Sequence, residues 1–258
     1  MATLRLTALI ALAGCTAAAP VRHEPTSGQL AGYWRISAID GKAPLSVGED
    51  AGERRISRFG FGARSYGGTS GCNFMGGLKI ERGSRLYTYP GPQTQMACMG
   101  PLGAQEAAID VLFRAAPTIA RQGSAVLLSG GGHTLRLVRE TDTAPVQDPP
   151  EAWQGTRFAG QSFELHQIDG DPLDRRPAPL LRFATRTATL AHVCPRPVSG
   201  AYVQGPESLR IVFNPSCPGA QRHFAGTLTT ASGPNGELLL AGEGHWLAGD
   251  NLRRDRPK

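Results

Sequence analysis

The chain has few of the aromatic residues that stack on nucleic-acid bases. Aromatic residues make up 7% of its 258 residues, and histidine occurs only 6 times. The net charge of +6 comes mostly from arginines that are spread along the chain. A nucleic-acid interface usually combines clustered positive charge with aromatic stacking residues. We therefore expect no nucleic-acid partner and interpret the arginines as a solvated surface, with attraction to anionic lipid or cell-wall surfaces as the alternative.

Sequence motifs of common enzymes are also missing. There is no Gly-x-Ser-x-Gly elbow, and Ser70 falls in a Gly-Thr-Ser-Gly turn. The glycines at 130–132 lack the Lys-Ser or Lys-Thr pair and the helix of a phosphate-binding loop. Asp169 and Asp171 lie in a proline-containing turn, which is typical of solvated acids rather than of a catalytic pair. The sequence predicts no catalytic residues, no cofactor and no enzymatic activity.

The sequence contains no long apolar run, and the apolar run near the N-terminus is short. About eight apolar residues, Leu6 to Ala13, follow Arg5, which suits the core of a secretion signal but not the roughly 20 residues of a transmembrane helix. The run ends in Leu-Ala-Gly-Cys, which resembles the box at which bacterial lipoproteins are cut and lipidated on the cysteine, here Cys15. Cleavage near Ala17 to Ala19 by an ordinary signal peptidase is the alternative.

The lipoprotein interpretation fixes the expected ends and location of the mature chain. We expect residues 1–15 to form the signal with the lipidated Cys15, and residues 16–28 to form a tether. The acyl chains would hold the protein on a membrane, because each buried methylene contributes about 0.8 kcal/mol. The expected partner is thus the membrane, through the lipid anchor, and the expected location is the periplasmic face of the outer membrane.

Glycine and proline are abundant, at 33 and 20 residues, between short runs of strand-forming residues. This pattern favours an α+β fold, mainly antiparallel β, with many turns. A segment at 141–152 contains three prolines and no apolar periodicity, which is typical of a linker. We expect one domain at 29–140 and a second at 153–258.

The two expected domains repeat the same order of motifs. Each opens with an aromatic and aliphatic strand that ends in Ile-Asp-Gly, at 39–41 and at 168–170, and each closes with a glycine hairpin, at 127–135 and at 239–247. Between them each copy carries a cysteine pair, and the pairs are Cys72 with Cys98 and Cys194 with Cys217. Such a repeat predicts two similar small twisted-sheet or barrel-like domains.

One difference separates the copies. Residues 105–116 carry apolar side chains at helical spacing and are stopped by Pro117, whereas no such stripe follows Cys217. We therefore predict one packed helix in the first domain and a lost or shortened helix in the second.

The first copy resembles the META-domain family, the HslJ-like heat-inducible proteins of bacterial envelopes. The resemblance covers roughly residues 29 to 139 and rests on Trp34, an Asp-Gly turn, the loop Gly71-Cys72-Asn73, the element at 94–98 and the helix. The second copy lacks the Gly-Cys-Asn loop and the Thr-x-Met element, so it resembles the family only through the repeat.

The motif residues have a structural interpretation and a functional one. Gly71 and Asn73 suit positive backbone angles in a tight loop, and a bridge between Cys72 and Cys98 would close about 26 residues, worth roughly 3 kcal/mol. If the family role depends on the loop, the candidate functional residues are Gly71, Asn73, Thr94 and Met96.

Metal binding is the alternative role for the cysteines. His192-x-Cys194 and the pair Cys217 and His223 have loosely ligand-like spacing, but no Cys-x-x-Cys or His-x-x-x-His pair supports them. We therefore expect no metal, and we expect a structural role for His133 and His245, which occupy equivalent hairpin positions.

The resemblance implies a non-enzymatic envelope lipoprotein, with heat shock, motility or secretion, and antibiotic tolerance as the associations of the family. The alternative is a binding module on the envelope for a small molecule, a peptide or a foreign hydrolase. That alternative requires an exposed apolar patch, for which Tyr87, Tyr89 and Met96 are the candidates.

Overall fold

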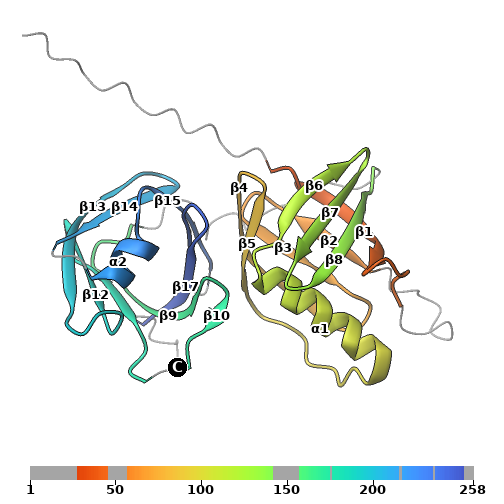
Figure 1. Ribbon diagram of the computed structural model, residues 1–258, viewed down its shortest axis with the longest axis horizontal. Coiled ribbons are helices and arrows are strands. Elements are labelled where there is room, and N and C mark those ends of the chain that lie inside the picture. Colours follow the sequence, from red (N-terminus) through yellow and green to blue (C-terminus); the bar gives the residue numbers. More distant parts are fainter. Residues whose placement is uncertain are drawn as a thin grey trace, which may run out of the picture.

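A computed structural model of the protein describes residues 28–45, 57–141, 157–174, 176–214, 217–234 and 236–252. These residues form two antiparallel barrel-like sheets that follow one another along the chain, with one helix packed on the first (Figure 1). The predicted fold class is therefore confirmed. Cys15, the predicted signal and tether, and most of the predicted linker lie outside the described residues. Among the described helices, none is long and apolar enough to cross a membrane.

The first sheet is a closed barrel in which each strand pairs with the next and β8 pairs with β1. Its strands are β1 (Gly32–Ile39), β2 (Arg58–Phe61), β3 (Ser65–Thr69), β4 (Phe74–Arg82), β5 (Arg85–Pro90), β6 (Thr118–Gln122), β7 (Ala125–Gly130) and β8 (His133–Arg139). Aromatic and aliphatic side chains from alternate positions fill the interior, among them Trp34, Phe59 and Phe61, which are fully buried.

Helix α1 (Gly100–Arg114) confirms the predicted helix and begins earlier than the apolar stripe. Pro101 lies in its first turn, where the missing N–H has no intrahelical partner to lose. Ile109, Leu112 and Phe113 face the barrel and are buried. Phe113 packs edge-to-face on Phe59, with ring centroids 5.2 Å apart.

The interior of the first barrel also holds a charged pair. Lys79 and Glu81, on alternate positions of β4, are 1% and 6% exposed, and Lys79 Nζ lies 2.5 Å from Glu81 Oε1. The backbone N–H of Leu30 donates to Glu81 Oε2 at 3.3 Å. The ammonium group is therefore buried with a carboxylate partner, as a buried charge requires.

The second sheet closes through a pairing of β9 with β17. Its strands are β9 (Ser162–Ile168), β10 (Asp171–Pro172), β11 (Leu180–Phe183), β12 (Thr187–Ala191), β13 (Val198–Gln204), β14 (Ser208–Phe213), β15 (Leu228–Ser232), β16 (Glu237–Ala241) and β17 (Trp246–Asn251). Helix α2 (Pro218–His223) has 6 residues and follows Cys217, in the place that α1 takes after Cys98. The helix of the second copy is thus shortened, as predicted.

Equivalent aspartates fasten the opening strand to the closing strand in both barrels. Asp40 and Asp169 have positive φ angles of 49° and 52°, and each is followed by a glycine with positive φ. Asp40 Oδ1 accepts the backbone N–H of Thr134 at 2.7 Å, and Asp169 Oδ1 accepts that of Trp246 at 2.8 Å. The repeated Ile-Asp-Gly motif is therefore a left-handed turn whose side chain reaches the last hairpin of its own barrel.

The two barrels share an apolar interface. Outward side chains of β4 and β5 pack against β15 to β17 of the second barrel, and the buried cluster contains Leu78, Ile80, Tyr87, Tyr89, Ala116, Ala231, Leu239, Ala241, Trp246 and Ala248. Tyr87 and Trp246 meet edge-to-face at 6.3 Å. The expectation that Tyr87 and Tyr89 belong to an exposed patch is wrong, because the second barrel covers them to 3% and 8% exposure.

Candidate functional site

The Gly-Cys-Asn loop connects β3 to β4 at one end of the first barrel. Gly71 has φ of +112°, and a Cβ there would lie 2.7 Å from the carbonyl oxygen of Leu45, so only glycine fits without strain. Cys72 and Cys98 form a disulfide with their Cα atoms 6.3 Å apart. The bridge joins the loop to the segment that leads into α1.

Asn73 is the centre of a hydrogen-bond network, and both the oxygen and the nitrogen of its side-chain amide take part in it. Its Oδ1 accepts from the backbone N–H of Met96 at 2.7 Å and from the Thr94 hydroxyl at 3.1 Å. Its Nδ2 donates to Glu106 Oε1 at 2.9 Å and to the Met96 carbonyl at 3.1 Å. Asn73 is absent from the residues with positive φ, so the predicted backbone role is wrong for Asn73 and the amide side chain explains its place instead.

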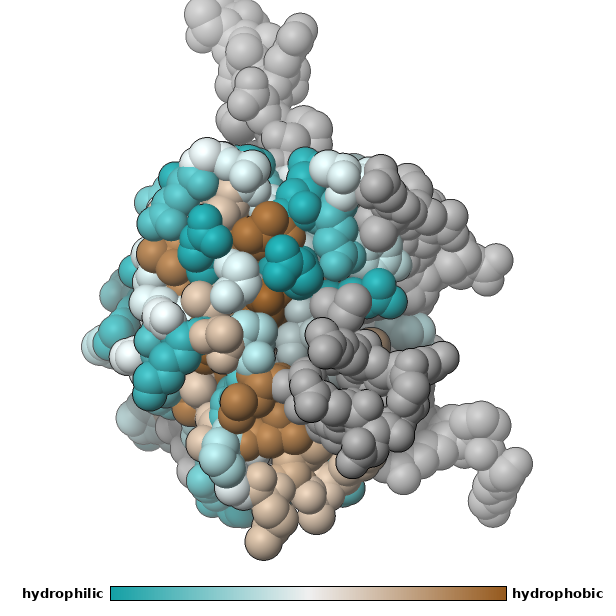
Figure 2. Space-filling view, turned by 90° about the vertical axis from the view of Figure 1, so that its right-hand side faces the viewer, coloured by the Kyte–Doolittle hydropathy of each residue, from teal (hydrophilic) through white to brown (hydrophobic). Residues whose placement is uncertain are grey.

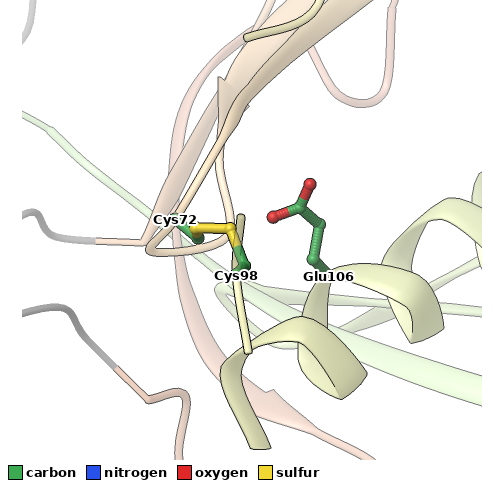
Figure 3. A group of neighbouring side chains, drawn as sticks. All are labelled: Cys72, Cys98 and Glu106. Atoms are coloured by element: carbon green, nitrogen blue, oxygen red, sulfur yellow. A yellow bond between two sulfur atoms is a disulfide. The ribbon is translucent and has the colours of Figure 1, made fainter. Parts of the chain in front are cut away.

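Glu106 brings a carboxylate from α1 to the disulfide (Figure 3). One ligand atom from each of Cys72, Cys98 and Glu106 lies within 4.8 Å of the others, which is the only such group among the described residues. Both sulfurs are used by the disulfide, and the carboxylate accepts Nδ2 and the backbone N–H of Asn73. In this state the group joins loop, segment and helix; we call Cys72, Asn73, Thr94, Cys98 and Glu106 the latch.

Of the other predicted residues in this region, Thr94 lies inside the latch and Met96 lies at its edge. The Thr94 hydroxyl accepts the backbone N–H of Phe74 at 2.8 Å, while the Met96 side chain is 46% exposed. Glu106 was not among the predicted site residues, although its position in the second turn of the helix that follows the second cysteine is a usable signal.

The described cysteines and histidines of the second barrel form no cluster like that of Cys72, Cys98 and Glu106. Cys194 and Cys217 form a disulfide with Cα atoms 5.9 Å apart. His192 Nδ1 lies 2.7 Å from the carbonyl oxygen of Ala178, and His223 Nδ1 lies 3.3 Å from Asp169 Oδ2. The ligand-like spacing in the sequence therefore does not converge on one point among the residues described.

The hairpin histidines also have different partners. His133 Nδ1 lies 2.8 Å from Asp40 Oδ2, and this hydrogen bond, with the N–H of Thr134, lowers the pKa of Asp40. His245 Nδ1 lies 3.0 Å from the carbonyl oxygen of Glu243. The aspartate of the second barrel pairs with His223 instead, so the two hairpin positions are equivalent in the sequence but not in their contacts.

A polar chain crosses between the barrels beside the apolar interface. The Tyr89 hydroxyl donates to Asp250 Oδ1 at 3.2 Å, and His166 Nε2 lies 3.3 Å from Asp250 Oδ2. Burial and the Asp250 carboxylate raise the pKa of Tyr89, and the hydrogen bond to Asp250 raises the pKa of His166. Both shifts favour the protonated forms, which are the forms that donate to Asp250.

A cavity of about 660 Å³ lies over the outer face of β1 to β5 and reaches the second barrel at Pro234 and Glu237. Its volume falls within the range of roughly 300–1,000 Å³ that small-molecule sites occupy. We call it the trough. Tyr33, Arg58, Phe74, Tyr89 and Pro92 contribute side chains to its lining.

The strand register explains why the trough is hollow. Gly60 pairs with Gly67, and Gly67 pairs with Gly76, so neighbouring strands place glycines in one row across the outer face. Tyr33 continues the row on β1 opposite Gly60. Because successive residues of a strand point to opposite faces, side chains resume only two positions away, at Thr69 and Phe74 on one side and at Leu78 and Tyr89 on the other.

Phe74 is the most exposed aromatic wall of the trough, with 52% of its surface exposed. A Cβ on Gly67 would lie 3.1 Å from Phe74 Cζ, so the ring leans over the glycine floor. On the face that Figure 2 shows, on the first barrel's side of the molecule, apolar residues lie in separate groups between hydrophilic ones. On that face the exposed apolar surface is divided into separate groups and forms no single continuous patch.

Comparisons with known proteins cover the two barrels unequally. Residues 28–142 match the family model of the META domain. Among solved structures the chain is similar to a protein from Burkholderia xenovorans determined by NMR, with 26% identity, a TM-score of 0.34, and coverage of 52% of this chain and 99% of that chain. It is also similar to the DNA polymerase III β subunit of Thermotoga maritima, with 10% identity, a TM-score of 0.18, and coverage of 89% of this chain and 58% of that chain. A comparison with curated proteins finds no match.

Proposed function

Residues 28–142 form a META domain, and on this basis we propose that the protein is a non-enzymatic, lipid-anchored protein of the cell envelope. The family itself suggests an envelope-associated protein. The observation that carries the non-enzymatic part is the saturation of the latch. Asn73, Thr94 and Glu106 bind one another and the backbone, and both cysteines are joined, so the motif residues are all engaged in holding the loop to the helix.

The anchor rests on the sequence box that ends in Cys15, followed by the expected tether. Cys15→Ser in the full chain should move the protein from the membrane fraction to the soluble periplasm and abolish palmitate labelling. Ala17→Ser is the matched control, because it places a serine two residues beyond the box and leaves Cys15 and both disulfides intact. Unchanged fractionation of Cys15→Ser would contradict lipidation at this residue.

A role in heat stress or drug tolerance is the finer part of the proposal. It is supported by the association of the family and by the intact latch in the first barrel, which the second barrel lacks. Deletion of the gene should reduce survival of heat or of an antibiotic, and the full chain should restore it. A variant with a disrupted latch and a normal melting temperature tests the part of the latch. If this variant also restores survival, the phenotype depends on another surface of the protein.

A binding module is the second candidate function, and the trough is the observation that favours it. It combines a concave volume of about 660 Å³ with a half-exposed aromatic wall and contributions from both barrels. Such a combination is the usual starting hypothesis for a ligand site. Replacing Gly67 by Val should fill the floor with an outward side chain. A ligand that binds the unaltered protein and the variant equally well would place binding elsewhere.

A further inference from the structure

The charges at one end of the trough indicate which class of ligand it would bind. Arg58 lines the trough and its guanidinium carbon lies 5.8 Å from the centre of the Tyr33 ring. Arg35 lies directly opposite Arg58 in the pairing of β1 with β2, and both side chains are exposed. Like charges in directly opposed positions repel each other. Within the described part of the chain no ion pair of either arginine is found, so an anion at this end would relieve the repulsion.

Among the described residues, the acidic groups near the trough do not neutralise that end. Glu140 follows β8, and its backbone N–H donates to the carbonyl of Tyr33, so the end of β8 brings one acidic residue to the strand that carries Arg35. Glu237 lies at the opposite end, on the second barrel, and takes part in an interaction of its own. The local balance at the Arg58 end is therefore positive.

The rest of the trough offers mainly apolar contact, with the hydroxyl groups of Ser65, Thr69 and Tyr89 as its polar side-chain groups. The backbone groups of Gly60, Gly67 and Gly76 belong to the sheet ladder, so the floor presents flat, hydrogen-bonded peptide units. Phe74, Leu78 and Pro92 line the sides and the far end. The five strands from β1 to β5 span four spacings of about 4.8 Å, which gives a length of about 19 Å. An elongated apolar body fits this shape better than a compact polar one.

We propose that the trough binds a single-chain anionic amphiphile, with its acyl chain along the glycine floor and its anionic head group at Arg58 and Arg35. This inference rests on the binding-module function proposed above. Removal of its methylene groups from water supplies the affinity of the chain, and the arginines fix its direction.

Isothermal titration calorimetry of the full chain with sodium dodecanoate, kept below its micelle concentration, tests the proposal. We expect saturable binding with one site, and we expect Arg58→Gln to weaken it about tenfold. Gly67→Val should weaken it at least about tenfold, because the new side chain occupies the floor. Arg210→Gln removes an exposed arginine from β14 of the second barrel and should leave binding unchanged.

A probe with the same chain and the opposite head-group charge makes the result decisive. Dodecyltrimethylammonium has the same chain with a positive head and should bind at least about tenfold more weakly than dodecanoate. Equal binding of both probes, abolished by Gly67→Val, would overturn the anionic part and leave the trough as a binding site. Absence of dodecanoate binding, or binding that Arg58→Gln and Gly67→Val leave unchanged in folded proteins, would overturn the inference. Neither result bears on membrane anchoring through Cys15.

Discussion

The latch makes a specific prediction about Asn73→Asp. The substitution keeps the shape of the side chain but replaces the Nδ2 donor, 2.9 Å from Glu106 Oε1, by an oxygen. It removes a hydrogen bond to a charged group, worth about 2 kcal/mol, and the bond to the Met96 carbonyl, worth about 1 kcal/mol. Repulsion between two carboxylates adds to this loss, so we expect the free energy of unfolding to fall by at least about 3 kcal/mol at pH 7.5.

The pH dependence of the variant separates charge repulsion from loss of packing. Two carboxylates this close raise the pKa of one of them, and a protonated oxygen can again donate to its neighbour. The unfolded variant has ordinary carboxyl pKa values, so the native state takes up a proton first and the loss of stability becomes smaller as the pH falls toward 5.

Urea denaturation at pH 7.5 and pH 5, with the disulfides intact, measures the effect. Gln122→Glu adds the same charge at an exposed position on β6 and should change stability little at either pH. A loss for Asn73→Asp below about 1 kcal/mol, or a loss that does not shrink at pH 5, would refute the account of the latch.

Three further experiments test the disulfide of the latch, the buried ion pair and the contact of His166 with Asp250. Replacing Cys72 and Cys98 together by Ser should lower the free energy of unfolding by about 3 kcal/mol in urea denaturation, because the bridge closes a separation of 26 residues; no change would mean that the latch holds without it. Glu81→Gln should cost about 3 kcal/mol or more by leaving the Lys79 ammonium buried without its carboxylate, whereas Lys79→Met combined with Glu81→Leu should recover most of the loss. His166→Gln should flatten the dependence of melting temperature on pH: the raised pKa of His166 makes its contact with Asp250 fully stabilising below about pH 6.5 and weaker as the pH rises through that raised pKa, so an unchanged profile would exclude this contact.

The repeat was predictable because its residues determine local structure. Asp-Gly favours a left-handed turn, and the structure has that turn at Asp40 and at Asp169. The helical spacing of Ile109, Leu112 and Phe113 likewise predicts α1, because one face of a helix must be buried. These features depend on residues close together in the sequence.

The interface and the trough were not predictable in the same way. Tyr87 and Tyr89 alternate with inward residues of β5 and so point outward, which suggests exposure until a second barrel covers them. The apolar residues on this outer face, opposite the inward Lys79 and Glu81, are the sequence signal for such a cover. The glycine row requires the register of three strands, and a shift of one residue in any pairing would destroy it.

The apolar interface gives the second barrel a structural role that does not depend on the family motif. Trp246 and its neighbours bury the outward residues of β4 and β5, and the same barrel brings Pro234 and Glu237 to one end of the trough. Neither contribution needs the Gly-Cys-Asn loop or a long helix, because both come from strands and turns. Loss of the motif in the second copy is therefore compatible with a continuing role, in which that barrel covers an apolar face of the first and completes a site that the first barrel leaves open at one end.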